Sequence, residues 1–113
     1  MGFDRESALV QLRKGVLEYC VLAHLRRSPS YGLKLATDLA GFKTLFASEG
    51  TLYPLLARLR KQGLVETSWQ ESTSGPPRRY YRITRAGEDA LAVFAAAWVS
   101  FTQEATQALE DQK

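Results

Sequence analysis

The chain has 113 residues, which is enough for one domain or for one domain with an extension. Its composition is 45% hydrophobic and 24% charged, as is typical of a globular protein and not of a disordered one. The net charge is +3. A single cysteine and a single histidine exclude an internal disulfide, a multi-cysteine zinc site and a two-histidine metal site within one chain.

Charge is distributed unevenly along the chain. Residues 1–61 contain ten basic and five acidic residues, whereas residues 86–113 contain one basic and five acidic. This asymmetry favours contact with a polyanion at one end and another role at the other, although a chance scatter of solvated charges is the alternative. No apolar run reaches the roughly 18 residues of a membrane span, and the first residues are too polar for a signal peptide. We therefore expect a cytoplasmic protein without membrane contact.

Residues 8–27 are predicted to form one helix with Ser7 as its N-cap. Its apolar residues lie on two faces, which indicates burial on both sides. Cys20 and His24 are one turn apart on this helix. We interpret them as a packed thiol and an ordinary helix histidine, because no third group is available to orient the histidine for catalysis.

Two shorter helices are predicted next. Pro29 ends the first helix, and Ser30 caps a second helix over residues 31–39. A third helix follows Ser48 and has a core stripe of leucines at helical spacing. Pro54 lies inside this third helix, so we expect a bend or a late start near Thr51. The leucines of the stripe are Leu52, Leu55, Leu56 and Leu59.

Residues 64–69 and 79–84 are rich in aromatic and branched side chains and are predicted to form a β-hairpin. The polar, Gly/Pro-rich residues 70–78 between them are predicted to form a long loop at its tip. An isolated hairpin is marginally stable, so this one must pack on the helices. Of the adjacent Tyr80 and Tyr81, we assign Tyr81 to the packed face.

A long final helix is predicted over residues 86–109. Its apolar residues step by three and four positions, which is the spacing of a heptad seam. Three of them are large aromatic residues, too much apolar surface for a monomer to expose, so the helix is predicted to form a dimer contact. The seam consists of Leu91, Phe94, Trp98, Phe101, Ala105 and Ala108.

The order of these elements predicts a mostly α fold with a β-hairpin wing. Residues 1–85 would form a winged helix-turn-helix domain and residues 86–113 a C-terminal dimerisation helix. The outward face of the third helix combines small residues, a hydroxyl group and two cations, which suits entry into a major groove of DNA. Arg78 and Arg79 on the wing are placed to reach the adjacent backbone or minor groove.

Six stretches of the sequence, within about residues 13–88, resemble the PadR family of transcriptional regulators. The similarity is to its short, single-domain members, including those that bind multiple drugs. The stretches are LEYCVL (17–22), SYG (30–32), SEGTLYPLLARL (48–59), GLV (63–65), GPPRRYYRIT (75–84) and Gly87.

This resemblance implies a dimeric protein that binds a double-stranded DNA operator, and most similar proteins are repressors released by an effector. In the family the third helix and the wing contact DNA, and Tyr31 lies near the surface that contacts the DNA backbone. The residues that carry over are Tyr31, Ser48, Thr51, Tyr53, Arg58, Lys61, Gly75, Arg78 and Arg79.

The resemblance also makes the C-terminal helix the dimerisation element, completed by the first helix. In multidrug-binding relatives, a tryptophan at the place of Trp98 pairs with its symmetry mate, and flat aromatic ligands stack between the two rings. Trp98 with Phe94 is therefore a candidate effector site, with a plain interface tryptophan as the alternative. The expected interface residues are Leu9, Leu12, Val16, Leu91, Phe94, Trp98 and Phe101.

The sequence thus predicts a dimeric, DNA-binding repressor without cofactor or metal, released by a small-molecule effector. The alternative is a winged-helix module that binds proteins and not DNA, since fold alone does not settle function. An enzyme is not expected, because the chain lacks an acid–base or nucleophile constellation and a Gly-rich phosphate loop.

Overall fold

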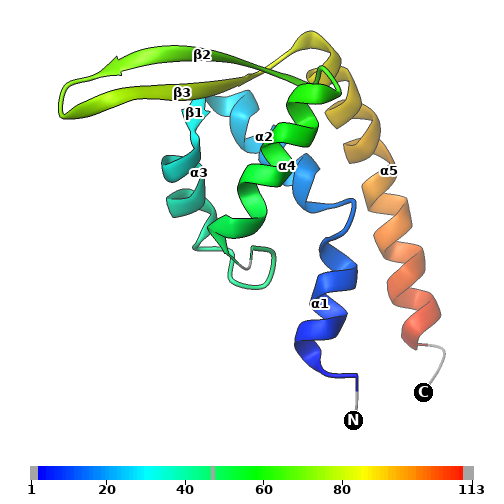
Figure 1. The fold of residues 1–113 in the computed structure, drawn as a ribbon. Helices are drawn as coiled ribbons and strands as arrows, with labels where there is room; N and C mark the ends of the chain where they lie inside the picture. Colours follow the sequence, from blue (N-terminus) through cyan, green and yellow to red (C-terminus); the bar gives the residue numbers. More distant parts are fainter. Residues whose placement is uncertain (1–2, 47, 111–113) are drawn as a thin grey trace.

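The computed structural model describes residues 3–46 and 48–110 (Figure 1). Three helices form a head, a hairpin projects from it, and the first and last helices extend toward the opposite end. This architecture confirms the predicted mostly α fold with a wing and a long C-terminal helix. The elements are α1 (Arg5–Arg13), α2 (Leu17–Arg27), β1 (Ser30–Tyr31), α3 (Gly32–Leu39), the 3-10 turn η1 (Glu49–Thr51), α4 (Leu52–Lys61), β2 (Val65–Ser72), β3 (Gly75–Ile83) and α5 (Arg85–Glu110).

The prediction of one helix over residues 8–27 is wrong, because the chain turns between α1 and α2. Gly15 at this turn has a φ of +77°, a left-handed conformation that glycine adopts without steric cost. The N-cap of α1 is Asp4 and not Ser7: the Asp4 carboxylate accepts a hydrogen bond from the Ser7 backbone N–H at 2.9 Å. α2 buries four residues, whereas α1 buries none. The expected burial on both sides therefore does not hold for α1, and the buried residues of this region lie on α2 alone.

The second predicted helix starts later than expected. Ser30 and Tyr31 do not begin a helix but form β1, which pairs antiparallel with Tyr81 and Tyr80 of β3. The sheet order is thus β1-β3-β2. Ser30 is buried in this strand and caps no helix, and Tyr31 has the extended backbone of the N-cap of α3. A two-residue strand has no pattern of its own; it exists because it satisfies part of the open edge of β3.

The late start of the third helix is confirmed. The chain makes the 3-10 turn η1 first, and α4 begins at Leu52. Pro54 then lies in the first helical turn, where the backbone N–H has no intrahelical partner to lose. Gly63, with a φ of +77°, ends the helix, as predicted. Its N–H donates to the Arg60 carbonyl, and the Leu64 N–H donates to the Leu59 carbonyl, both at 3.0 Å, which is a Schellman motif.

The wing is longer than the sequence predicts, and its tip is shorter. Most of residues 70–78 belong to strands, so the prediction of a long loop there is wrong. A register shift between Gln70 and Ser72 accommodates Pro76 and Pro77, which have no N–H for the ladder. β1 pairs only with Tyr80 and Tyr81, so the other edge of β3 is also open at the prolines.

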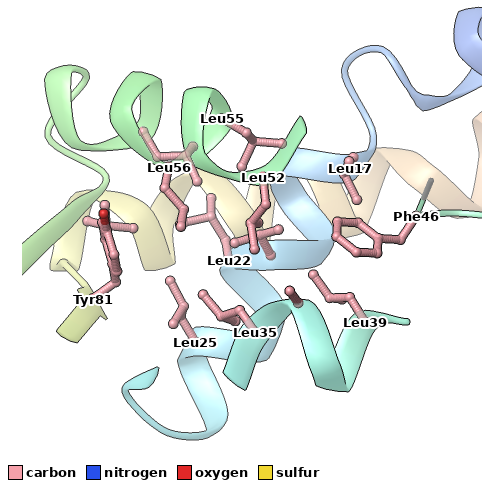
Figure 2. Close-up of a cluster of buried hydrophobic side chains, with 14 of the residues drawn as sticks. Leu17, Leu22, Leu25, Leu35, Leu39, Phe46, Leu52, Leu55, Leu56 and Tyr81 are labelled. Carbon is pink, nitrogen blue, oxygen red and sulfur yellow. The ribbon is translucent and has the colours of Figure 1, made fainter. Parts of the chain in front are cut away.

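The core lies between α2, α3 and α4, and leucine side chains dominate it (Figure 2). Tyr81 closes it from the sheet, which confirms its predicted packing role. Leu91 attaches α5 to the same cluster. None of the helices in the described residues is both long and apolar enough to cross a membrane.

α5 starts at a junction with the end of α4 and the wing. Thr84 is its N-cap: the side-chain oxygen Oγ1 accepts a hydrogen bond from the Gly87 N–H at 3.0 Å. The same hydroxyl donates to the Gly63 carbonyl at 2.7 Å, and the Thr84 N–H donates to the Leu64 carbonyl at 3.1 Å. Thr84 therefore ties the start of α5 to the end of α4.

Candidate nucleic-acid interface

α4 presents an outward face because its four leucines are all buried. With 3.6 residues per turn, burying Leu52, Leu55, Leu56 and Leu59 leaves the remaining positions at the surface. Four of the predicted DNA-contacting residues are exposed on this helix or on the turn before it. They are Thr51, Tyr53, Arg58 and Lys61.

Tyr53 connects this face to the start of α3. Its ring packs directly over Gly32, where an added Cβ would lie 2.5 Å from the ring atom Cε1. A side chain at residue 32 would displace the Tyr53 ring from this position. The Tyr-Gly pair at residues 31–32 and Tyr53 therefore form one structural unit.

The two wing arginines each lie against an aromatic ring. The Arg78 guanidinium is 4.4 Å from the centroid of the Tyr31 ring, and the Arg79 guanidinium is 5.0 Å from that of Trp69. Tyr31 is held in turn by Tyr80, whose ring makes an edge contact with it at 5.2 Å. Trp69 faces Arg79 directly across the β2–β3 ladder.

Tyr31, Arg78 and Arg79 border a cavity of about 280 Å³ between α3, α4 and β3, which we name the wing notch. The structure thus brings together four predicted site residues that are up to 48 positions apart in the sequence: Tyr31, Tyr53, Arg78 and Arg79. Sequence reasoning missed Leu33, an exposed leucine of α3 that also lines the notch. The notch is lined by Tyr31, Gly32, Leu33, Tyr53, Arg78, Arg79 and Tyr81.

The remaining predicted DNA-contacting residues lie outside the notch. The Arg58 guanidinium is 3.9 Å from the Glu18 carboxylate of α2 and lines a separate cavity beside α1. Ser48 precedes η1, and its carbonyl accepts a hydrogen bond from the Thr51 hydroxyl at 2.8 Å. Lys61 is on the last turn of α4, and Gly75 begins β3 at the wing tip.

Some arginines in and beside the wing are paired with carboxylates, and others are not. Arg82 is ion-paired with Glu66, and Arg85, just beyond the wing, with Asp89. Within residues 3–46 and 48–110, neither Arg78 nor Arg79 forms an ion pair, and the Nε atom of Arg79 has no hydrogen-bond partner. The surface around the notch therefore keeps the positive charge of both arginines.

α5 contributes a second feature, an aromatic stack against α2. The Phe94 ring is 4.1 Å from the Tyr19 ring at an interplanar angle of 6°, and Trp98 continues the stack 5.5 Å from Phe94. Trp98 is 40% exposed and Phe101 is 67% exposed. The seam of α5 thus begins against its own chain and becomes open surface farther along the helix.

The predicted dimer-interface residues divide in the same way. Leu91 is only 4% exposed and belongs to the core of its own chain, so its placement at a dimer interface is corrected here. The seam pattern placed it there because a heptad does not distinguish a partner within the chain from a partner in a second copy. On α1, Leu12 is exposed and Leu9 is half-buried, and Val16, the residue before α2, is half-buried as well.

Cys20 and His24 have structural surroundings, in agreement with their interpretation as packed residues. His24 Nε2 lies 3.0 Å from the Asp38 carboxylate and thereby links α2 to α3. Burial raises the pKa of the Cys20 thiol, which disfavours the reactive thiolate. The Lys34 ammonium donates a hydrogen bond to Asp38 and, with a smaller effect from His24, lowers the pKa of that carboxyl group. No cluster of three metal-ligating side chains occurs in the described part of the chain.

The sequence of this chain is similar to a known protein family and to a protein of that kind. The sequence model described as the Transcriptional regulator PadR-like family matches residues 21–93. A transcriptional regulator of Mycobacterium tuberculosis is 35% identical over 83 residues, which cover 72% of this chain and 74% of the relative.

Two solved structures are similar over most of the chain. A PadR family transcriptional regulator from Eggerthella lenta has 37% identity and a TM-score of 0.81, covering 93% of this chain and 91% of that one. A PadR-like transcriptional regulator from Bacillus cereus has 38% identity and a TM-score of 0.77, covering 88% and 96%, respectively. The fold, wing and final helix are therefore shared with proteins of this description.

Proposed function

Since this chain belongs to the PadR-like family of transcriptional regulators, we propose that it is a dimeric repressor that binds a DNA operator sequence-specifically and is released by a small-molecule effector. Members of this family are transcriptional regulators and not enzymes, and they bind DNA and typically form dimers. For this chain we propose in addition that it recognises a specific operator, represses transcription there and is released by an effector. A cytoplasmic location, with the DNA, belongs to this proposal as well.

The observation that carries the DNA-binding part is the wing notch beside the outward face of α4. Arg78 and Arg79, which form no ion pair with any residue that the structure describes, border it. Tyr31 and Tyr53 add hydroxyl groups that can donate to phosphate oxygens. The exposed residues of α4 would enter a major groove, with Arg58 and Lys61 on the flanking phosphates. Ser48 at the start of η1 and Gly75 at the wing tip would approach the backbone closely.

The exposed part of the α5 seam supports the dimer. Residues 1–85 would act as the DNA-binding domain, and residues 86–113 as the dimerisation helix, of which the structure describes residues up to 110. Phe101, Trp98 and the exposed Leu12 of α1 are apolar surface that a second copy would cover. A two-fold dimer would place two α4 helices in successive major grooves of a pseudo-palindromic operator.

Trp98 and Phe94 are the proposed effector site. Their rings form a stack that ends in a half-exposed indole, and a flat aromatic compound would extend this stack across the interface. Binding there would change the spacing of the two heads, and a coupling free energy of about 1–3 kcal/mol would be enough to release the operator. A tryptophan that only packs against the second copy is the alternative.

The deciding test measures operator binding and oligomeric state together. DNA fragments selected by the purified protein provide the probe, and fluorescence anisotropy provides the affinity. A variant with Arg58, Lys61, Arg78 and Arg79 all changed to Glu should lose operator binding but sediment as the same dimer. Arg85→Glu, a cation of α5 outside this surface, is the control and should bind DNA well.

The same experiment separates this proposal from its alternative. Full DNA binding by the four-residue variant, or no selection of DNA by the unmodified protein, would favour a winged-helix module that binds other proteins. Effector binding has its own test. Flat aromatic compounds should quench tryptophan fluorescence in the unmodified protein and not in Trp98→Ala, with Trp69→Phe as the control for the second tryptophan.

A further inference from the structure

The arginines of the wing are held by two different kinds of partner. Arg82 is held by a carboxylate, that of Glu66, whereas Arg78 and Arg79 lie on the rings of Tyr31 and Trp69. All three arginines are within five residues of one another on β3. Because they lie on the same strand, their different partners come from the residue that faces each arginine and not from its position in the fold.

The kind of partner determines how much charge an arginine retains. A carboxylate fixes the guanidinium but cancels its charge, whereas an aromatic face attracts the cation through its quadrupole and leaves the charge in place. The N–H groups at the edge of a stacked guanidinium also stay free to donate, and their fork geometry matches two phosphate oxygens. Arg78 and Arg79 are thus positioned and still charged.

Trp69 has no other role that its surroundings explain. It is 65% exposed, and it lies on β2 beyond the part of the sheet that packs on the core. Its cross-strand neighbour in the ladder is Arg79. The exposure of this large indole is explained if the ring holds Arg79, which has no ion pair within the described part of the chain.

Tyr31 is arranged in a comparable way for Arg78. Strand pairing with Tyr80 fixes its backbone, and the two tyrosine rings make an edge contact with their centroids 5.2 Å apart. The Tyr31 ring on which Arg78 lies is thus itself held by a neighbouring side chain. The short strand β1 therefore has a use beyond covering part of the edge of β3.

We propose that Tyr31 and Trp69 are positioning residues that hold Arg78 and Arg79 in place for contacts with DNA backbone phosphates. This inference rests on the proposed DNA-binding function. A guanidinium held in advance loses less conformational freedom when it meets a phosphate. Contacts with phosphates fix the position of the protein on the duplex and do not depend on base sequence.

The principal experiment is a double-mutant cycle on Trp69 and Arg79 in the full-length protein. Affinity for a selected operator fragment is measured by fluorescence anisotropy over a series of salt concentrations. Trp69→Leu should weaken binding by about two- to fivefold, and Trp69→Phe should bind as the unmodified protein does. Arg79→Gln should reduce the slope of log affinity against log salt by about one. In the Arg79→Gln background, Trp69→Leu should have no further effect.

The same cycle applies to Tyr31 and Arg78. Tyr31→Phe removes only the hydroxyl group, and Tyr31→Leu removes the ring as well. The further loss of affinity from Phe to Leu measures the ring, and Arg78→Gln should abolish it. Urea unfolding checks that each variant is folded. Trp69 is exposed, so Trp69→Leu decides the inference by itself if Tyr31→Leu does not fold. Arg82→Gln combined with Glu66→Gln removes the neutralised pair and is the matched control, which should bind DNA normally.

Several results would overturn the inference while leaving the proposed function intact. One is unchanged affinity of Trp69→Leu when Arg79→Gln binds weakly, and another is additive losses in the cycle. A third is a loss that appears on the operator but not on an unrelated duplex, because phosphate contacts must weaken both equally. If the unmodified protein bound no DNA at all, the proposed function itself would fail.

Discussion

Gly87 lies where α5 crosses the start of β2, and there is no room for a side chain. A Cβ atom at this position would overlap the Leu64 carbonyl oxygen and a side-chain carbon of Ile83. Gly87→Ala should therefore lower the free energy of unfolding by about 1–3 kcal/mol, as overpacking does. Urea unfolding at a fixed protein concentration measures this, since dimer stability depends on concentration. Gly75→Ala, which meets no atom within 4 Å, is the matched control.

Asp38 gives the chain a pH-dependent contact between α2 and α3. Its hydrogen bond from Lys34 and its proximity to His24 lower its pKa below the ordinary value of 3.8. A lowered pKa in the folded state means that ionised Asp38 stabilises the fold above about pH 4, and that this stability is lost as the pH falls through the lowered pKa. The stability difference between the unmodified protein and Asp38→Asn should thus shrink below pH 4. A difference that stayed constant from pH 5 to pH 2.5 in urea unfolding would contradict this.

At the scale of elements, Thr84 joins the wing to α5. Its hydroxyl accepts from the Gly87 N–H and donates to the Gly63 carbonyl, so it connects the end of α4 with the start of α5. Thr84→Ala should lower the free energy of unfolding by about 1 kcal/mol, as the loss of an N-cap does. Thr84→Ser keeps the hydroxyl group and should retain most of that stability. Equal losses in both variants would mean that the threonine methyl group, and not the cap, matters.

The elements also differ in how far their sequence defines them. α4 and α5 were predicted closely, because leucine periodicity, the Gly63 stop and the apolar seam are all local signals. The break at Gly15 was missed because apolar residues continue on both sides of it. The wing strands were predicted too short, since Pro76 and Pro77 are typical of loops unless a bulge and an open edge accommodate them.

At the scale of the whole molecule, the charge of the wing and of α4 should make DNA binding strongly dependent on salt. If the dimer makes six to ten phosphate contacts, its affinity should fall about 10³- to 10⁵-fold between 50 and 200 mM salt. Fluorescence anisotropy titrations at several salt concentrations measure the slope. An affinity that did not change with salt would be incompatible with phosphate contacts by Arg78, Arg79 and Lys61.

Dimerisation should depend on the open end of the α5 seam. Phe101 is largely exposed in the single chain, and burying a phenylalanine contributes about 1.5–3 kcal/mol. Phe101→Glu should therefore weaken the dimer at least about tenfold, as measured by sedimentation equilibrium. Gln103→Glu adds the same charge two residues farther along α5, where the side chain points away from the seam, and should leave the dimer intact. Similar dissociation of both variants would implicate charge and not the lost aromatic contact.

The candidate site was predicted in its residues but not in its arrangement. Tyr31, Tyr53, Arg78 and Arg79 were expected to contact DNA, and the structure places all four at one notch. Leu33 also lines the notch and was not expected there, and the contact of Trp69 with Arg79 was not expected either. The register that sets Trp69 opposite Arg79 would have identified it, but that register depends on a bulge that the sequence does not reveal.

The sequence by itself determined the helices with regular leucine spacing, the presence of the wing and the family. These features depend on residues close together in the sequence and on short motifs, and both can be recognised from the sequence alone. Only the tertiary structure decided that Leu91 is inside, that Ser30 and Tyr31 form a strand, and that two arginines lie on aromatic rings while a third is neutralised. Those outcomes depend on contacts between residues far apart in the chain, which the packing of the whole fold sets.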